Sequence, residues 1–171
     1  MENKKFGVEI NPVRFLFMSD FASFSGTVSL FALDRHAEIA FPLFWGQGNS
    51  DHRIAEFDVD CHYRYFLGNN QKGFYLSGFL RYAYLHGYTE DPAYKYIGHS
   101  ANRAGIGAGL GYRIFSQKGF YWGAGLIIGR YMDAGYRFDI DASSLSSLLG
   151  SLTSSSYGIL EFEILKFGWA F

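Results

Sequence analysis

The last seven residues of the chain limit its fold more than any other segment. They read Leu-Lys-Phe-Gly-Trp-Ala-Phe from Leu165 to Phe171, so large apolar residues alternate with charged or small ones. Because successive residues of a β-strand point to opposite faces, this pattern predicts a strand with one aromatic face and one small or polar face. In strands that cross a membrane as a barrel, large apolar groups face lipid and small or polar groups face the lumen. The predicted outward face consists of Leu165, Phe167, Trp169 and Phe171.

Composition fits a chain made of many strands. The 171 residues predict a single domain spanning 1–171, and aromatic residues, which favour strands, make up 20% of them. Hydrophobic residues reach 49%, yet the mean hydropathy is -0.02, so apolar and polar residues alternate more than they cluster. The sequence contains no apolar run of about 18 residues, the length of a membrane-spanning helix. A membrane-spanning form of this chain must therefore be a closed barrel.

Charge, cysteine content and the start of the chain narrow the functional classes. The net charge of -1 gives no basis for nucleic-acid binding, and Cys61, the single cysteine, cannot form an internal disulfide. The five histidines have no metal-ligand spacing, so we expect no metal and no cofactor. The chain starts directly on a strand pattern without an export signal, and we therefore expect the mature form of an exported protein with a start Met added.

Alternation and turn residues divide the chain into eight predicted strands. The fourth has the clearest pattern, with aromatic and apolar residues from Phe57 to Tyr65 on one face and charged residues from Glu56 to Arg64 on the other. The parity of the last strand changes near Ile164, which predicts a β-bulge there. The fold class predicted is all-β, a closed eight-stranded antiparallel up-and-down transmembrane β-barrel. Its strands are expected at about 6–17, 25–33, 37–45, 56–65, 74–84, 105–114, 120–129 and 160–171.

The connections between these strands form a second pattern. Connections near residues 34–35, 69–70 and 116–117 are predicted to be short, and those over 46–53, 89–102 and 133–157 to be long. Outer-membrane barrels have short periplasmic turns and longer outer loops. In the last predicted loop, Leu145, Leu148, Leu149 and Leu152 have helical spacing, which predicts a short amphipathic helix.

A soluble, lipocalin-like ligand-binding barrel is the alternative fold, with the faces reversed. Glycines argue against it, because Gly105 to Gly111 and Gly123 to Gly129 would then leave one side of the barrel bare to solvent. Placed inside, these glycines make room for bulky groups such as Tyr75 and Phe79.

With this layout the chain resembles the small eight-stranded outer-membrane barrels of the OmpA/OmpX type. Residues 10–12 and 72–76 also resemble segments of small uncharacterised barrel families. The resemblance implies location in the outer membrane, contact with outer-membrane lipid, a monomeric state, and a final strand read by the barrel-assembly machinery. Members include adhesion or defence factors, structural anchors and some lipid-modifying enzymes, so the resemblance does not select one function or loop partner.

Charged residues on the inward faces are the main candidate site. An eight-stranded barrel is just wide enough for its side chains to fill, so these groups must pair or stay hydrated. We expect a lumen plugged by a charge network and a non-catalytic role in membrane integrity or in surface contact through the outer loops. The predicted network joins Glu9, Glu38, Glu56, Asp58, Asp60, Glu161 and Glu163 with His62, Arg64, Arg81, Arg113 and Lys166.

A lipid-modifying enzyme similar to the lipid A deacylases is the alternative function. Those enzymes use a serine activated by histidine, and this chain offers His99 and Ser100 in a predicted loop, with Glu90 and Asp91 nearby. The spacing of the deacylase pair is absent, so the sequence assigns no catalytic residue.

Aromatic residues near the strand ends predict two girdles at the lipid interfaces. They are Trp45, Tyr63, Tyr65, Tyr82, Tyr84, Tyr112, Trp122 and Trp169.

Overall fold

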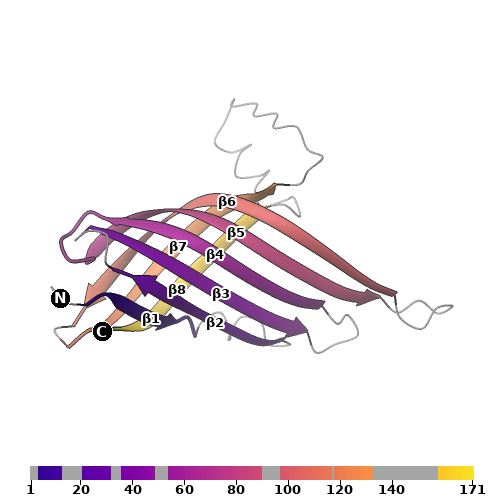
Figure 1. Ribbon diagram of the computed structural model, residues 1–171, viewed down its shortest axis with the longest axis horizontal. Coiled ribbons are helices and arrows are strands. Elements are labelled where there is room, and N and C mark those ends of the chain that lie inside the picture. Colours follow the sequence, from indigo (N-terminus) through magenta and orange to yellow (C-terminus); the bar gives the residue numbers. More distant parts are fainter. Residues whose placement is uncertain are drawn as a thin grey trace, which may run out of the picture.

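The protein folds into a single closed β-barrel (Figure 1). The computed structural model describes residues 4–12, 21–31, 36–48, 54–89, 97–116, 118–132 and 158–171. Each strand pairs antiparallel with the next, and the last returns to the first, which confirms the predicted eight-stranded antiparallel fold. Within the described ranges, no helix is long and apolar enough to cross a membrane. The strands are β1 (Phe6–Ile10), β2 (Phe21–Leu30), β3 (Ala37–Gly48), β4 (Ile54–Phe66), β5 (Gly73–Thr89), β6 (Ile97–Phe115), β7 (Phe120–Met132) and β8 (Gly158–Ala170).

Alternation along the strands separates an apolar outer face from a polar inner one. In β4, Phe57, Tyr63 and Tyr65 are exposed outward, whereas Asp58 and Arg64 are buried inside. The same parity holds in β1, where Phe6, Val8 and Ile10 are exposed. A period of two residues places each set on its own face. Aromatic and aliphatic side chains therefore coat the barrel, and charged side chains fill it.

Inward glycines of β6 and β7 provide space for side chains from other strands. Gly107 of β6 lies opposite Gly129 of β7. A Cβ atom at Gly107 would come within 2.5 Å of the Phe79 ring, and one at Gly129 within 2.8 Å. These two glycines therefore allow the buried Phe79 ring of β5 to lie inside a narrow barrel.

Two of the predicted long loops are short, because the strands extend into them. The β3–β4 connection is 49–53, and the β5–β6 connection is 90–96, since β5 runs to Thr89 and β6 begins at Ile97. The strict alternation of short and long connections is therefore wrong, although the last connection, 133–157, is long. The hydrogen-bonded ladder between β5 and β6 continues from Leu85 opposite Ala101 to Thr89 opposite Ile97, so residues 97–102 of the predicted loop belong to β6. The predicted helix over Leu145–Leu152 and the end of the first predicted strand, 13–17, lie outside the described residues.

A β-bulge in β8 changes the parity of the last strand, as the sequence predicts. Glu163 pairs with Gly125 and Lys166 with Gly123, so Ile164 and Leu165 together lie opposite one residue of β7. Leu165 has a φ of 58°, a left-handed conformation that non-glycine residues seldom adopt. The bulge turns Lys166 into the lumen, where it is 4% exposed.

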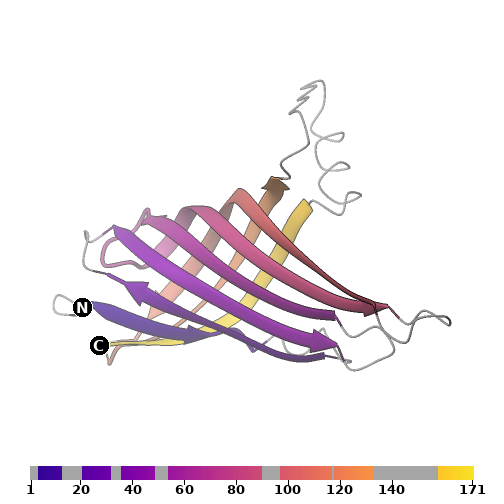
Figure 2. The ribbon, with the colours of Figure 1, turned by 45° about the vertical axis from the view of Figure 1, so that its right-hand side comes forward.

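Both chain termini lie at the end of the barrel that carries the connections 31–36, 67–72 and 116–119 (Figures 1 and 2). There β1 pairs with β8 from Gly7 opposite Ala170 to Ile10 opposite Phe167. The backbone oxygen of Phe171 accepts N–H hydrogens from Lys5 (3.0 Å) and Phe6 (3.1 Å). We call this end the turn end, and the opposite one the loop end.

Candidate functional site

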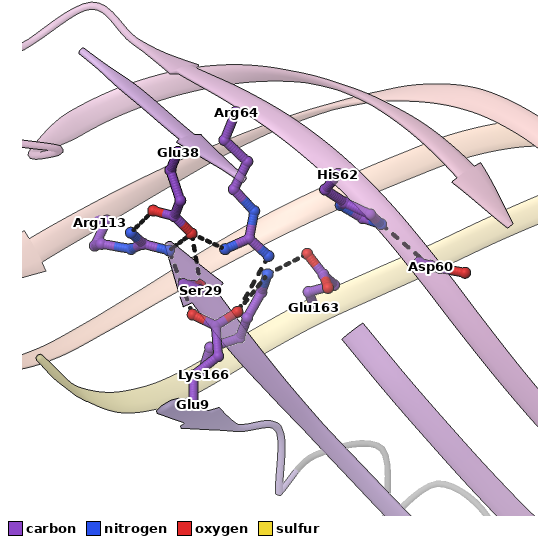
Figure 3. A network of polar contacts seen from close by, with 9 residues as sticks. All are labelled: Glu9, Ser29, Glu38, Asp60, His62, Arg64, Arg113, Glu163 and Lys166. Carbon is purple, nitrogen blue, oxygen red and sulfur yellow. Dashed lines mark hydrogen bonds and ion pairs between the residues drawn. The ribbon is translucent and has the colours of Figure 1, made fainter. Parts of the chain in front are cut away.

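A network of buried charges fills the lumen near the turn end (Figure 3). Arg64 of β4 donates to Glu38 of β3 (2.9 Å) and to Glu9 of β1 (3.1 Å). Arg113 of β6 contacts the same two carboxylates, at 3.2 Å from Glu38 Oε1 and 3.3 Å from Glu9 Oε2. The hydroxyl of Ser29 in β2 also donates to Glu38 (2.8 Å). The turn-end cluster comprises Glu9, Ser29, Glu38, Arg64, Arg113, Glu163 and Lys166.

Charge in the turn-end cluster is balanced. Lys166 pairs with Glu163 and lies 3.7 Å from Glu9. Three carboxylates thus face three cations, and each carboxylate contacts at least one cation. The side chains of Arg64 and Glu38 are both 0% exposed. Charges removed from water need close partners of opposite sign, and this cluster supplies them.

A second, more acidic group lies farther toward the loop end. Arg81 of β5 donates from Nε and Nη2 to the two oxygens of Asp60 (2.7 Å each), and from Nη1 to Glu161 across the lumen. Asp58 lies 3.8 Å from Arg81, and His62 lies 3.2 Å from Asp60. This loop-end cluster (Asp58, Asp60, His62, Arg81 and Glu161) has three carboxylates and one guanidinium. Glu56, also predicted for the network, is half-buried on β4 nearer the loop end.

Buried aromatic rings lie between the turn-end cluster and the turn end of the barrel. The rings of Phe31, Phe115 and Tyr121 pack together, with Phe115 and Tyr121 centroids 4.6 Å apart. The guanidinium of Arg113 lies 4.6 Å from the Tyr121 ring centroid and 5.0 Å from that of Phe66, a cation–π geometry. We call these buried rings, together with Tyr75, the ring cluster. Its members are Phe31, Phe66, Tyr75, Phe115 and Tyr121.

Glycines of neighbouring strands make room for these rings. A Cβ at Gly168 would lie 2.2 Å from the Tyr121 ring, and one at Gly111 would lie 2.3 Å from Tyr75. A Cβ at Gly7 would lie 2.5 Å from the Phe31 ring. The ring cluster therefore depends on small residues in β1, β6 and β8. The sequence predicts the space that Gly111 provides for Tyr75, but not the corresponding roles of Gly7 and Gly168.

Exposed aromatic residues form bands at both ends of the outer face. Toward the loop end, Phe24, Trp45, Phe57 and Tyr84 are consecutive register partners across β2 to β5. From Phe74 to Tyr84 on β5 the strand covers about 33 Å, or about 25 Å along an axis tilted by about 40°. That height matches the apolar band of outer-membrane barrels. The predicted girdle residues are all exposed, and the turn-end band comprises Phe6, Tyr65, Phe74, Tyr112, Phe120, Trp122, Trp169 and Phe171.

A repeated pentapeptide builds two of the turn-end connections. Gln-Lys-Gly-Phe-Tyr occurs at residues 71–75 and again at 117–121. In both copies the glycine has a positive φ, 85° at Gly73 and 97° at Gly119. The phenylalanine that follows is exposed outward and the tyrosine is buried in the ring cluster. The repeat can be recognised in the sequence, but only the structure shows that both copies form connections at the same end of the barrel.

The structure corrects the predicted location of the residues named for the alternative enzyme function. His99 and Ser100 belong to β6 rather than to a loop, and Ser100 is the register partner of His86. Glu90 and Asp91 lie outside the described residues. Among the residues that are described, no three His, Cys, Asp or Glu side chains are placed to hold a metal ion.

These features define the class of protein to which the fold belongs, an outer-membrane-type eight-stranded β-barrel with an apolar outer face. A solved structure with this fold is the N-terminal β-barrel domain of OprF from Pseudomonas aeruginosa, with a TM-score of 0.53 and 15% sequence identity over 99% of this chain and 100% of that one. The likeness concerns the fold, and it confirms the resemblance to small outer-membrane barrels that the strand pattern predicts. No protein-family model and no curated protein sequence matches the chain.

Proposed function

We propose that this protein is a non-catalytic integral barrel of the outer membrane that supports membrane integrity. The proposal rests mainly on the distribution of apolar surface. Leu80 is 57% exposed, Phe162 63% and Leu110 55%, each on the outer face between strand ends. Exposing each such side chain to water costs about 1.5–3 kcal/mol relative to burial, whereas lipid removes that cost. The charged residues of the turn-end cluster are instead buried or mostly buried inside the barrel, as expected for a polar lumen.

A lumen closed to solutes is the second part of the proposal. The turn-end cluster joins six strands across the interior, and the ring cluster lies between it and the turn end. Both features favour an anchor over a porin. Surface contact through the loop-end connections is compatible with this role, and 133–157 is the longest segment available for it.

The sequence of the last strand supports the part of the proposal that concerns how this barrel is inserted into the membrane. Leu165, Trp169 and Phe171 are exposed outward, and Phe167 is half-buried on the same face. Such an aromatic final strand suits recognition by the barrel-assembly machinery.

Membrane insertion can be tested with Cys61, which is exposed on the outer face and pairs with Leu80. In vesicles, a water-soluble maleimide should fail to label Cys61 until the barrel is unfolded in hot SDS. The matched control is the double variant Cys61→Ser/Lys72→Cys, whose thiol lies in an exposed turn and should label in both states. The unboiled protein should also migrate differently from the boiled protein on an SDS gel. A chain that dissolves without detergent and labels fully at Cys61 would refute the proposal.

Closure of the lumen can be tested separately in planar bilayers. The refolded protein should give no conductance of porin size. Such conductance would remove the closed lumen from the proposal while leaving the membrane location intact.

A further inference from the structure

Three exposed lysines surround the turn end, directly outside its aromatic band. Lys5 precedes Phe6, and Lys72 and Lys118 each precede a Gly-Phe pair. The phenylalanine after each lysine is exposed outward. Lys4 differs, because its ammonium donates to the Ala170 carbonyl (2.5 Å) and is part of the strand closure. We call Lys5, Lys72 and Lys118 the lysine collar.

The backbone sets the position of each lysine in the repeated turns relative to the aromatic band. Gly73 and Gly119 both adopt a positive φ, which L-residues with a side chain rarely do. In each copy this turn leaves the lysine exposed, directs the next phenylalanine outward and buries the following tyrosine. Two separate connections thus present the same cation next to the same lipid-facing ring.

Among the described side chains of this end, no acidic group on the outer rim offsets the positive charge of the lysine collar. Glu9, Glu38 and Glu163 belong to the turn-end cluster, where each contacts a cation inside the lumen. The segments 1–3 and 32–35, which are not described, together have two acidic residues and one basic residue in the sequence. The described outer rim at the turn end is therefore basic in a chain whose net charge is -1.

We propose that the lysine collar binds the anionic headgroups of phospholipids, such as phosphatidylglycerol, in the leaflet that surrounds the turn end. This inference rests on the proposed function, because it requires a barrel that spans a membrane. The headgroup layer extends about 5–8 Å beyond the hydrocarbon on each side. A lysine next to an interfacial ring reaches this layer while its stem stays along apolar surface. A zwitterionic headgroup has no net charge to neutralise the collar, whereas an anionic one does.

Tryptophan fluorescence can test this preference at one end of the barrel at a time. Trp169 lies in the turn-end band and Trp45 in the loop-end band. Two single-tryptophan proteins are needed, Trp45→Phe/Trp122→Phe and Trp122→Phe/Trp169→Phe. Each is inserted into vesicles of phosphatidylcholine and phosphatidylglycerol in equal amounts, with the quenching bromine placed on one lipid or on the other.

We expect Trp169 to show a local preference for brominated phosphatidylglycerol of up to about fivefold at low salt, since one lysine near an anionic surface contributes about 1 kcal/mol. Trp45 should show no preference between the two lipids. The triple variant Lys5→Gln/Lys72→Gln/Lys118→Gln should abolish the preference at Trp169. The matched control Arg130→Gln, which removes a cation near the loop end of β7, should retain it.

The outcomes separate this inference from the proposed function. Equal quenching of Trp169 by both brominated lipids, or an unchanged preference in the triple variant, would overturn the collar while the barrel stays a membrane protein. Absence of quenching at both tryptophans in every mixture would overturn membrane insertion itself. Added salt tests the same point without any substitution, because screening should weaken the preference of the wild-type chain. If the triple variant fails to refold, this salt dependence decides.

Discussion

The turn-end and loop-end halves of the lumen differ in how their buried charges are paired. In the turn-end cluster three carboxylates meet three cations, and Glu38 alone accepts hydrogen bonds from Ser29, Arg64 and Arg113. In the loop-end cluster three carboxylates share Arg81. Both clusters occupy inward positions of the barrel wall, and they share β4 and β8. The difference between them teaches that removal of one carboxylate should cost much more stability in the turn-end cluster than in the loop-end cluster.

Glu38→Gln should have the largest effect. The change keeps the shape of the side chain but leaves Arg64 and Arg113 with Glu9 as their remaining carboxylate partner in the cluster. Breaking a buried ion pair by removal of one partner costs about 3–5 kcal/mol. Urea unfolding of the barrel in vesicles should show a loss of that size in the free energy of unfolding. A loss below about 1 kcal/mol would show that the turn-end cluster adds little to stability.

Gly168→Ala should have the next largest effect, because its new methyl group would lie 2.2 Å from the Tyr121 ring. That ring is packed against Phe115 and Arg113, so it cannot move away freely. Overpacking of this kind costs about 1–3 kcal/mol. Gly78→Ala is the matched control, because no atom lies within 4 Å of its added Cβ. The temperature at which the unboiled gel band disappears should fall for the first variant and stay constant for the second.

Ser29→Ala should have a smaller effect. It removes one hydrogen bond to the charged Glu38 and leaves both guanidinium contacts intact, so we expect a cost of about 1.5 kcal/mol, the low end for a hydrogen bond to a charged group. A double-mutant cycle with Glu38→Gln measures the coupling between the two residues. Strictly additive losses would show that the hydroxyl acts independently of the turn-end cluster.

Asp58→Asn should have the smallest effect. Asp60 and Glu161 still hold Arg81 in this variant, and one negative charge leaves an acidic region. We expect the free energy of unfolding to change by less than about 1 kcal/mol, in either direction. A loss equal to that of Glu38→Gln would break the comparison between the halves, since both clusters would then depend on each carboxylate to the same degree.

The side of the barrel that each residue faces could be read from the sequence, because parity in a strand is a local property. The row from Phe57 to Tyr65 and the aromatic final strand show this, and even the bulge near Ile164 was visible as a parity change. Ion-pair partners could not be predicted in the same way. Glu9 meets Arg64 at a separation of 55 residues and Arg113 at 104, and those contacts depend on how the strands are staggered around the barrel.

Loop lengths were predicted less well for a different reason. The alternating pattern predicts a strand end at Tyr84, but the ladder between β5 and β6 continues to Thr89. Backbone hydrogen bonds between two neighbouring strands require no apolar side chains. A hairpin can therefore extend beyond the apolar band, and the sequence pattern does not mark where it ends.

Glu9 also bears on the order in which the barrel assembles. It is the acidic residue of β1, and its three cationic partners come from β4, β6 and β8. A sheet that lacks its final strand lacks the Lys166 contact, and a sheet that lacks β1 leaves Arg64 and Arg113 to share Glu38. A sheet without β1 would thus leave the three cations of the turn-end cluster with two carboxylates, which disfavours its exposure to hydrocarbon. Pairing of β1 with its two neighbours therefore closes the barrel and balances the turn-end cluster in one step, so the polar contents of this barrel make its insertion cooperative.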